Sequence, residues 1–181
     1  MSEAEVSLRL AFWLIERRLT DSPVDVAIDG AQVKTANQVH FDIFAFLNRN
    51  GWAQRDLSSR WQCEWVRASE SPPIRVHSRP GKGDVVARLC SGRVLRVESK
   101  KGPLSRTPAS PEYRLMREAL GQLVTIDEVS REDLLAIAVP HAPKFQALAS
   151  RWREAPLIQQ FGIQILTIGR NGLVEGLNHS A

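Results

Sequence analysis

The chain has 181 residues, of which 43% are hydrophobic and 24% are charged, and its formal net charge is +4. This composition is typical of a globular protein with one domain and a sizeable core, and it contains no apolar run long enough to span a bilayer. The positive charge permits a polyanionic partner such as nucleic acid.

The two cysteines, Cys63 and Cys90, are too few for a disulfide framework and lack the spacing of metal ligands. They predict free thiols in a reducing compartment, and we therefore expect a cytoplasmic protein. Charged residues interrupt the apolar pattern near the N-terminus, which argues against a signal peptide.

The N-terminal part is predicted to form one amphipathic helix and one short strand. Apolar side chains recur at helical spacing over residues 3–19, and Ser2 stands three positions before Glu5, as in a capping box. Residues 24–28 alternate weakly between apolar and polar side chains, which favours a strand. We interpret residues 1–37 as an N-terminal helical extension.

Residues 38–50 fit either a strand or a buried helix, because apolar side chains dominate them. A helix is favoured, since residues 48–51 resemble a helix end with Gly51 in the left-handed conformation. His40 has no partner at the spacing of metal ligands, and we interpret it as structural.

Tryptophans and arginines are interleaved between Trp52 and Arg67. Such side chains can stack on bases and bind phosphates. Alternatively, the tryptophans are buried in the core while the charged ends of the arginines reach solvent. The second interpretation is favoured. Residues 61–66 and residues 74–77 are predicted to be extended.

Residues 83–102 predict a β-hairpin with a tight turn at Cys90-Ser91-Gly92. Asp84 opens the first strand, and Glu98 and Lys100 lie at the end of the second strand, on one face of it. Because the strands run back along each other, Asp84 is expected near Glu98. Two carboxylates and an ammonium group then converge at one edge of the sheet.

This convergence has a chemical use. Two neighbouring carboxylates repel each other, and Mg²⁺ relieves that repulsion while it keeps several waters and accepts a phosphate oxygen. A bound metal also acidifies water and stabilises charge on a phosphoryl group. The alternative is a solvated hairpin edge on which Glu98 and Lys100 form a simple ion pair.

The second half of the chain predicts a helix that starts at Ser110-Pro111, a buried strand over residues 134–139, a helix over residues 144–154 and a strand over residues 163–168. Residues 169–181 are expected to form a polar tail with one edge strand at Leu173-Val174. The predicted fold is α/β, with a mixed central β-sheet flanked by helices.

An aspartate at the start of one strand and Glu-x-Lys at the end of the next resembles the PD-(D/E)xK, or restriction-endonuclease-like, nuclease superfamily. The resemblance covers residues 38–168, and it implies a restriction-endonuclease-like core to which the N-terminal helix is added. It also implies that Asp84 and Glu98 bind Mg²⁺ or Mn²⁺, that the carbonyl of Ser99 assists, and that Lys100 positions the attacking water. Gly83 stands where the family pattern has proline.

The resemblance extends to further residues. Gln122, on the helix after the Glu-x-Lys strand, would complete the site, although the tyrosine that follows such a glutamine in some members is missing. Asp42 either adds a third acid or faces solvent in a first helical turn, and the solvent-facing position is favoured. Basic residues of the flanking loops are candidates for contact with a nucleic-acid backbone: Arg79, Lys82, Lys101 and Arg106.

The function expected from the resemblance is that of a metal-dependent endonuclease that hydrolyses DNA phosphodiester bonds. The alternative is a non-catalytic DNA-binding or assembly module on the same fold, and a third class is an α/β domain that acts only through protein partners. Cutting both strands of a duplex needs two active sites, for which a homodimer is one arrangement. No membrane partner is expected.

Overall fold

In the computed structural model, residues 1–35, 38–56, 60–67, 71–102 and 111–178 are described. Within them, nine strands form one sheet in the order β11-β10-β9-β8-β7-β1-β6-β5-β4, and two more pair as a separate ribbon. The strands of the sheet are β1 (Val24–Ala27), β4 (Ala53–Gln54), β5 (Glu64–Val66), β6 (Ile74–His77), β7 (Val85–Arg88), β8 (Val94–Ser99), β9 (Leu134–Pro140), β10 (Gln164–Ile168) and β11 (Val174–Glu175). The ribbon consists of β2 (Gln32–Thr35) and β3 (Gln38–Asp42).

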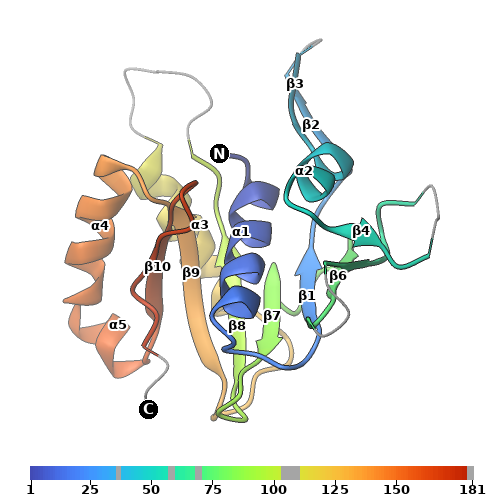
Figure 1. Cartoon of the computed structure of the whole chain (residues 1–181). Coiled ribbons are helices and arrows are strands. Elements are labelled where there is room, and N and C mark those ends of the chain that lie inside the picture. Colours follow the sequence, from blue (N-terminus) through green and yellow to red (C-terminus); the bar gives the residue numbers. More distant parts are fainter. Residues whose placement is uncertain (36–37, 57–59, 68–70, 103–110, 179–181) are drawn as a thin grey trace.

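Helices cover both faces of the sheet around its centre. One apolar cluster joins α1 (Glu3–Glu16) and α2 (Ile43–Arg49) to the sheet, and a second joins α3 (Glu112–Leu123), α4 (Pro143–Arg153) and α5 (Pro156–Gln160) to it. Figure 1 shows α1 in front of the sheet and α3 behind β9. Because β8–β9 and β9–β10 are parallel while β7–β8 is antiparallel, the sheet is mixed, as the sequence predicted.

The central strand β9 shows why the sequence pattern predicted this layering. Ala136 and Ala138 pack into the cluster that contains α1, whereas Ile137 and Val139 pack into the cluster that contains α3 and α4. Side chains alternate across a strand, so a continuous apolar run is expected where both faces are covered. The prediction of a buried strand over residues 134–139 is confirmed.

The N-terminal helix is part of the core and not an appendage. Ser2 caps α1, since its Oγ accepts a hydrogen bond of 3.1 Å from the backbone N–H of Glu5. The helix ends at Glu16, two residues before Arg18 takes a positive φ of 55°. Its apolar side packs on β1, β7, β8, β9 and β10. The predicted N-terminal extension therefore supplies one layer of the fold.

Only the second half of the helix predicted over residues 38–50 is confirmed. Residues 43–49 form α2, and Gly51 takes the expected left-handed conformation with φ of 77°. Residues 38–42 instead form β3, which pairs with β2, a strand that the sequence pattern did not indicate. Figure 1 shows this ribbon projecting from the body of the protein beside α2.

Two of the three tryptophans of the central segment are buried, as favoured, and Trp61 is partly buried. Trp52 and Trp65 are each 1% exposed, and Trp52 stacks on Phe12 with 5.4 Å between ring centroids. Arg67 makes an ion pair with Glu16 on the surface. Only the second half of the strand predicted over residues 61–66 is present, as β5, because residues 61–63 form bends.

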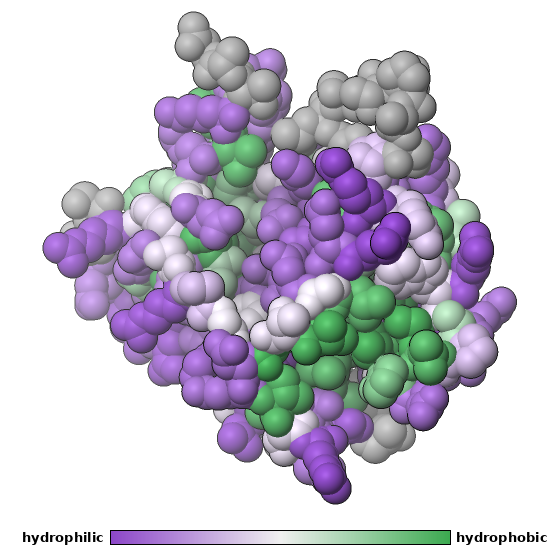
Figure 2. Space-filling model, turned by 180° about the vertical axis from the view of Figure 1, so that it is seen from behind, coloured by the Kyte–Doolittle hydropathy of each residue, from purple (hydrophilic) through white to green (hydrophobic). Residues whose placement is uncertain are grey.

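The surface is polar around the ribbon. Seen from behind, hydrophilic side chains dominate the end of the molecule that carries the ribbon, and an apolar patch lies farther down (Figure 2). Exposed large apolar side chains include Val124 and Val129, which follow α3. Within the described ranges, no helix has the length and apolar character needed to cross a membrane.

Candidate active site at the acidic hairpin

The predicted hairpin is present, with β7 and β8 paired from Val85 opposite Val97 to Arg88 opposite Val94. Asp84 is the residue just before β7, in a bend, and Glu98 is the last residue but one of β8. The Asp84 N–H donates to the Val97 carbonyl at 2.8 Å, and Asp84 Oδ2 accepts from the Ser99 N–H at 2.7 Å. Asp84 and Glu98 line the same cavity, and the charge of Asp84 contributes to the raised pKa of Glu98, so the two carboxyl groups are neighbours.

Gly83 has a structural reason for replacing the proline of the family pattern. Its φ is +99°, which proline cannot adopt, because its ring fixes φ near −65°. A Cβ at this position would also lie 3.1 Å from the Val97 carbonyl oxygen. The chain therefore enters the acidic strand through a turn that only glycine adopts without strain.

Burial shifts the pKa of both carboxyl groups upward. Burial raises the pKa of Asp84 to about 6, although its hydrogen bond from Ser99 works in the opposite direction. Burial, and then the charge of Asp84, raise the pKa of Glu98 to about 7. Glu98 is 8% exposed. Like charges held together in a poorly hydrated place favour protons or a cation.

Lys100 is buried beside a partner that sequence reasoning missed. The residue is 6% exposed, and its Nζ lies 3.6 Å from Oε1 of Glu3, in the first turn of α1. Burial raises the pKa of Glu3, while the nearby Lys100 lowers it. Ser7 donates a hydrogen bond to Ser99 Oγ at 2.9 Å, which fixes α1 against the end of β8. The start of α1 thus brings a third carboxylate to the site.

Two cavities meet at this acidic centre. One, of about 260 Å³, is lined in part by Glu3, Asp29, Asp84, Glu98 and Gln122. The other, of about 400 Å³, shares the first three of these residues and extends towards the ribbon. The predicted placement of Gln122 at the site is thus consistent with the structure. Asp29 was missed, because Asp29-Gly30 is a pair typical of a turn and indicates no site.

The predicted basic contacts are only partly gathered here. Arg79 lines the cavity that contains Glu98, and Lys101 lines the cavity on the ribbon side. Lys82 is absent from the described lining of both cavities, and its exposed ammonium pairs with Glu128 at 2.8 Å. Arg106 lies outside the described residues.

Asp42 does not join the acidic centre. Its Oδ1 accepts a hydrogen bond of 2.9 Å from the Ala45 N–H, so it caps α2, and its other oxygen accepts from Gln32. The N–H of Ala45, followed by Gln32, lowers the pKa of Asp42. The favoured interpretation, a residue of a first helical turn, agrees with this role. His40 is exposed on the ribbon.

Replacing Asp42 by alanine is expected to lower the free energy of unfolding by about 1 kcal/mol, because one capping hydrogen bond is lost. Asp42→Asn should retain most of that stability, since asparagine also caps helices. Urea unfolding of the three proteins measures both values. A third metal ligand at this position would instead make Asp42→Asn as damaging to any metal-dependent property as a substitution of Asp84.

The donor set is compatible with a hard divalent cation. Mg²⁺ is usually held by one or two carboxylates and keeps several waters. Asp84 and Glu98 supply two carboxylates whose pKa values are raised mainly by burial, although Lys100 works in the opposite direction, so a bound cation would favour their charged forms. Among the residues that the structure describes, no three Asp, Glu, His or Cys side chains are grouped closely enough to hold a metal by themselves. Water and a substrate oxygen would have to complete the coordination.

Comparisons with known proteins do not assign a function to this chain. No family model, no curated protein sequence and no solved structure matches the chain. What is established is a mixed α/β fold with a large central sheet, and a buried acidic centre at the end of its β7–β8 hairpin.

Proposed function

We propose that the protein is a metal-dependent endonuclease that hydrolyses DNA phosphodiester bonds. The observation that carries the proposal is that Asp84, just before β7, and Glu98, near the end of β8, line one cavity. Lys100 is buried close by, at the position that the PD-(D/E)xK resemblance assigns to the catalytic lysine. The helix–strand order after the hairpin supports a restriction-endonuclease-like core.

Asp84, Glu98 and the main-chain carbonyl of Ser99 would hold Mg²⁺ or Mn²⁺. When bound, the cation would supply an acidified water and stabilise negative charge on the phosphoryl group. Asp84 is held in place by the N–H of Ser99, so one of its oxygens is already oriented. Glu98 is held by the pairing of β8 with β9, in which it stands opposite Ile137.

Lys100 would orient the attacking water. Its backbone N–H donates to the Ala138 carbonyl at 2.8 Å, so the lysine continues the pairing of β8 with β9. Glu3 holds its ammonium group on the side of the acidic centre. Glu3 is accordingly a positioning residue in this proposal, and Gln122 would contact the substrate or the water from α3.

The basic residues around the centre would contact the DNA backbone. Arg79 lines the cavity next to the acids, and Lys101 lies on the ribbon side. Phosphate contacts of this kind position the duplex without reading its sequence. Cleavage of both strands would require two such centres, which a homodimer would provide.

The test is a cleavage panel of supercoiled plasmid, linear duplex, single-stranded and branched DNA, with Mg²⁺ or with EDTA. We expect cutting of at least one substrate by the wild type with Mg²⁺, no cutting with EDTA, and none by Asp84→Asn. Asp42→Asn is the matched control, since it makes the same change at an aspartate that caps a helix. Equal cutting by Asp84→Asn and wild type, or no cutting of any substrate, would contradict the proposal.

One observation favours the alternative, a DNA-binding or assembly module without catalysis. A carboxyl group with a pKa of about 7 is half protonated at neutral pH, and Lys100 already has Glu3 as its partner. In that case DNA affinity would fall steeply with salt and would be the same with and without Mg²⁺. Affinity that rises with Mg²⁺ and needs Asp84 would favour the enzyme.

A further inference from the structure

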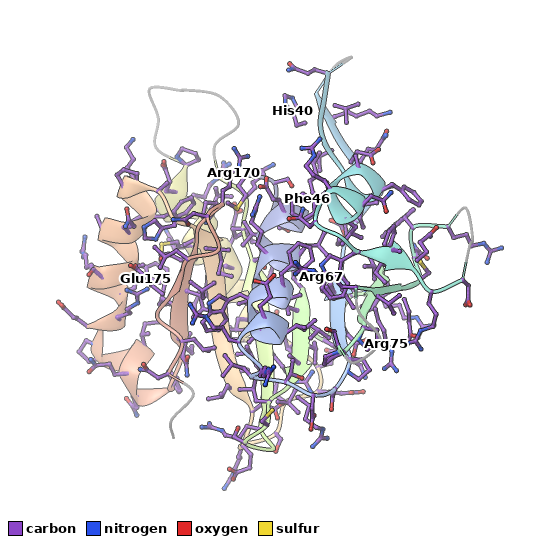
Figure 3. All side chains as sticks on the ribbon, in the orientation of Figure 1. His40, Phe46, Arg67, Arg75, Arg170 and Glu175 are labelled. Atoms are coloured by element: carbon purple, nitrogen blue, oxygen red, sulfur yellow. The ribbon has the colours of Figure 1, made fainter. Side chains whose placement is uncertain are left out.

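A third hollow, outside the acidic centre, is lined by basic and aromatic side chains. It measures about 520 Å³ and lies between α1, α2, β3 and the turn that joins β10 to β11. Its lining includes Arg9, His40, Phe46, Arg49 and Arg170. Figure 3 shows His40 on the ribbon, Phe46 on α2 and Arg170 near the upper end of α1. We call this hollow the arginine pocket.

A buried carboxylate fixes two of its arginines. Glu5 Oε1 accepts from Nε of Arg9 at 2.9 Å and from Nε of Arg170 at 3.0 Å, and Glu5 Oε2 accepts from Nη2 of Arg170 at 3.2 Å. The Glu5 side chain is only 10% exposed. Arg9 also donates to the Arg170 carbonyl at 2.8 Å, and its guanidinium group lies 5.3 Å from the centroid of the Phe46 ring. The two guanidinium groups are thus held in place before any ligand binds.

The pocket retains positive charge and unused donors. Three guanidinium groups face two carboxylates, and one of these, Asp42, is committed to capping α2. Each guanidinium group has five N–H donors. The hydrogen bonds found among the described residues use two of them on Arg9 and two on Arg170. Arg49, at the exposed end of α2, adds a third group of the same kind.

The arginine pocket adjoins the acidic centre. Glu3 lines both cavities of that centre, and Glu5, two residues later on α1, lines the pocket. At the base of the ribbon, Gln32 lines the nearer cavity and donates a hydrogen bond to Asp42, which lines the pocket. About half a turn of α1 and one strand pair therefore separate the two places.

We propose that the arginine pocket binds the phosphodiester backbone of a nucleic-acid strand whose neighbouring segment lies at the acidic centre. In naming nucleic acid as the ligand, this inference rests on the proposed function. The acidic centre, with Glu3, Asp29, Asp84 and Glu98, repels phosphates, so affinity for a polyanion must come from elsewhere. Guanidinium groups bind phosphate oxygens through paired hydrogen bonds, which makes the preoriented arginines a suitable anchor.

The test measures binding without cleavage. A fluorescently labelled single strand and a duplex of the same sequence are titrated with the full chain carrying Glu98→Gln, in EDTA and at several salt concentrations. Adding Arg49→Gln and Arg170→Gln should weaken binding about tenfold or more at low salt, and should reduce the slope of log K against log salt by about one to two. Arg49→Gln alone, at an exposed position, should give part of the loss without affecting the fold.

The matched control removes the same charge elsewhere. Arg88, the last residue of β7, and Arg151, on α4, are both exposed, and neither lines the pocket. Arg88→Gln with Arg151→Gln should change affinity less than threefold. Equal losses in the two pairs, or no binding by the parent protein at low salt, would overturn the inference. Neither result decides the proposed function, because the cleavage panel on the wild type tests that separately.

Discussion

Replacing Glu98 by glutamine is expected to stabilise the metal-free protein at pH 7.5 by about 2–3 kcal/mol, since one pKa unit corresponds to about 1.4 kcal/mol. The cause is burial, together with the charge of Asp84, which raises the pKa of Glu98 from 4.5 to about 7. Glutamine has nearly the same shape and no charge to desolvate. For a chain of this length, the melting temperature should rise by roughly 5–10 °C.

The pH dependence of this effect has a defined sign. The folded protein holds its proton on Glu98 more tightly than the unfolded chain does, so the wild type loses stability as the pH rises from about 4.5 to about 7. Below that window both states are protonated and the penalty disappears. The advantage of Glu98→Gln should therefore shrink to less than about 1 kcal/mol at pH 5.

A bound divalent cation should reverse the order of stability of the wild type and Glu98→Gln. A cation that binds only the folded form stabilises it by about 2.7 kcal/mol at a hundredfold excess over its dissociation constant. Wild type should therefore gain from Mg²⁺ or Mn²⁺, and Glu98→Gln should gain little. A melting series over pH and metal concentration gives both comparisons. A small loss of stability in Glu98→Gln, with no metal response in either protein, would instead indicate a solvated hairpin edge.

Replacing Lys100 by alanine is expected to lower the rate of DNA cleavage by about 10²–10⁴-fold at saturating Mg²⁺, the range typical of a group that assists proton transfer. The measurement is single-turnover cleavage of the substrate found in the panel. Lys144→Ala, at an exposed position on α4, removes the same charge and serves as the control. A rate within threefold of the wild type would remove Lys100 from the mechanism.

Lys100→Ala also leaves the half-buried Glu3 without its ammonium partner, so folding has to be checked. Glu3→Gln with Lys100→Ala removes the unpaired charge and should recover part of the stability, but none of the activity. Recovery of both stability and cleavage in this double variant would show that Lys100 only maintains the fold.

The elements that the sequence predicted are those whose pattern is local. Burial alternates along Val94-Leu95-Arg96-Val97, because only one face of β8 is fully buried there. The turn before this strand contains Gly92, which has a φ of 88°. Once this hairpin is identified, strand geometry places Asp84 and Glu98 at the same end of it. Gln122 followed from the family resemblance, and its place at the cavity agrees with it.

The missed features depend on contacts between distant segments. Glu3 reaches Lys100 only because α1 packs across the sheet and begins beside the end of β8, where Ser7 donates a hydrogen bond to Ser99. The strand at residues 38–42 was missed because its pairing partner, β2, has few apolar residues to mark it. The arginine pocket joins residues about 160 positions apart, Arg9 and Arg170, and no spacing in the sequence indicates that contact.

The most direct test of the central claim, that Asp84 and Glu98 share a divalent cation, is a titration of Mn²⁺ followed by electron paramagnetic resonance. The wild type should bind one Mn²⁺ per chain at neutral pH, Mg²⁺ should compete with it, and Asp84→Asn should abolish this binding while Asp42→Asn retains it. Equal binding by wild type and Asp84→Asn, or no binding by the wild type at millimolar Mn²⁺, would contradict the account.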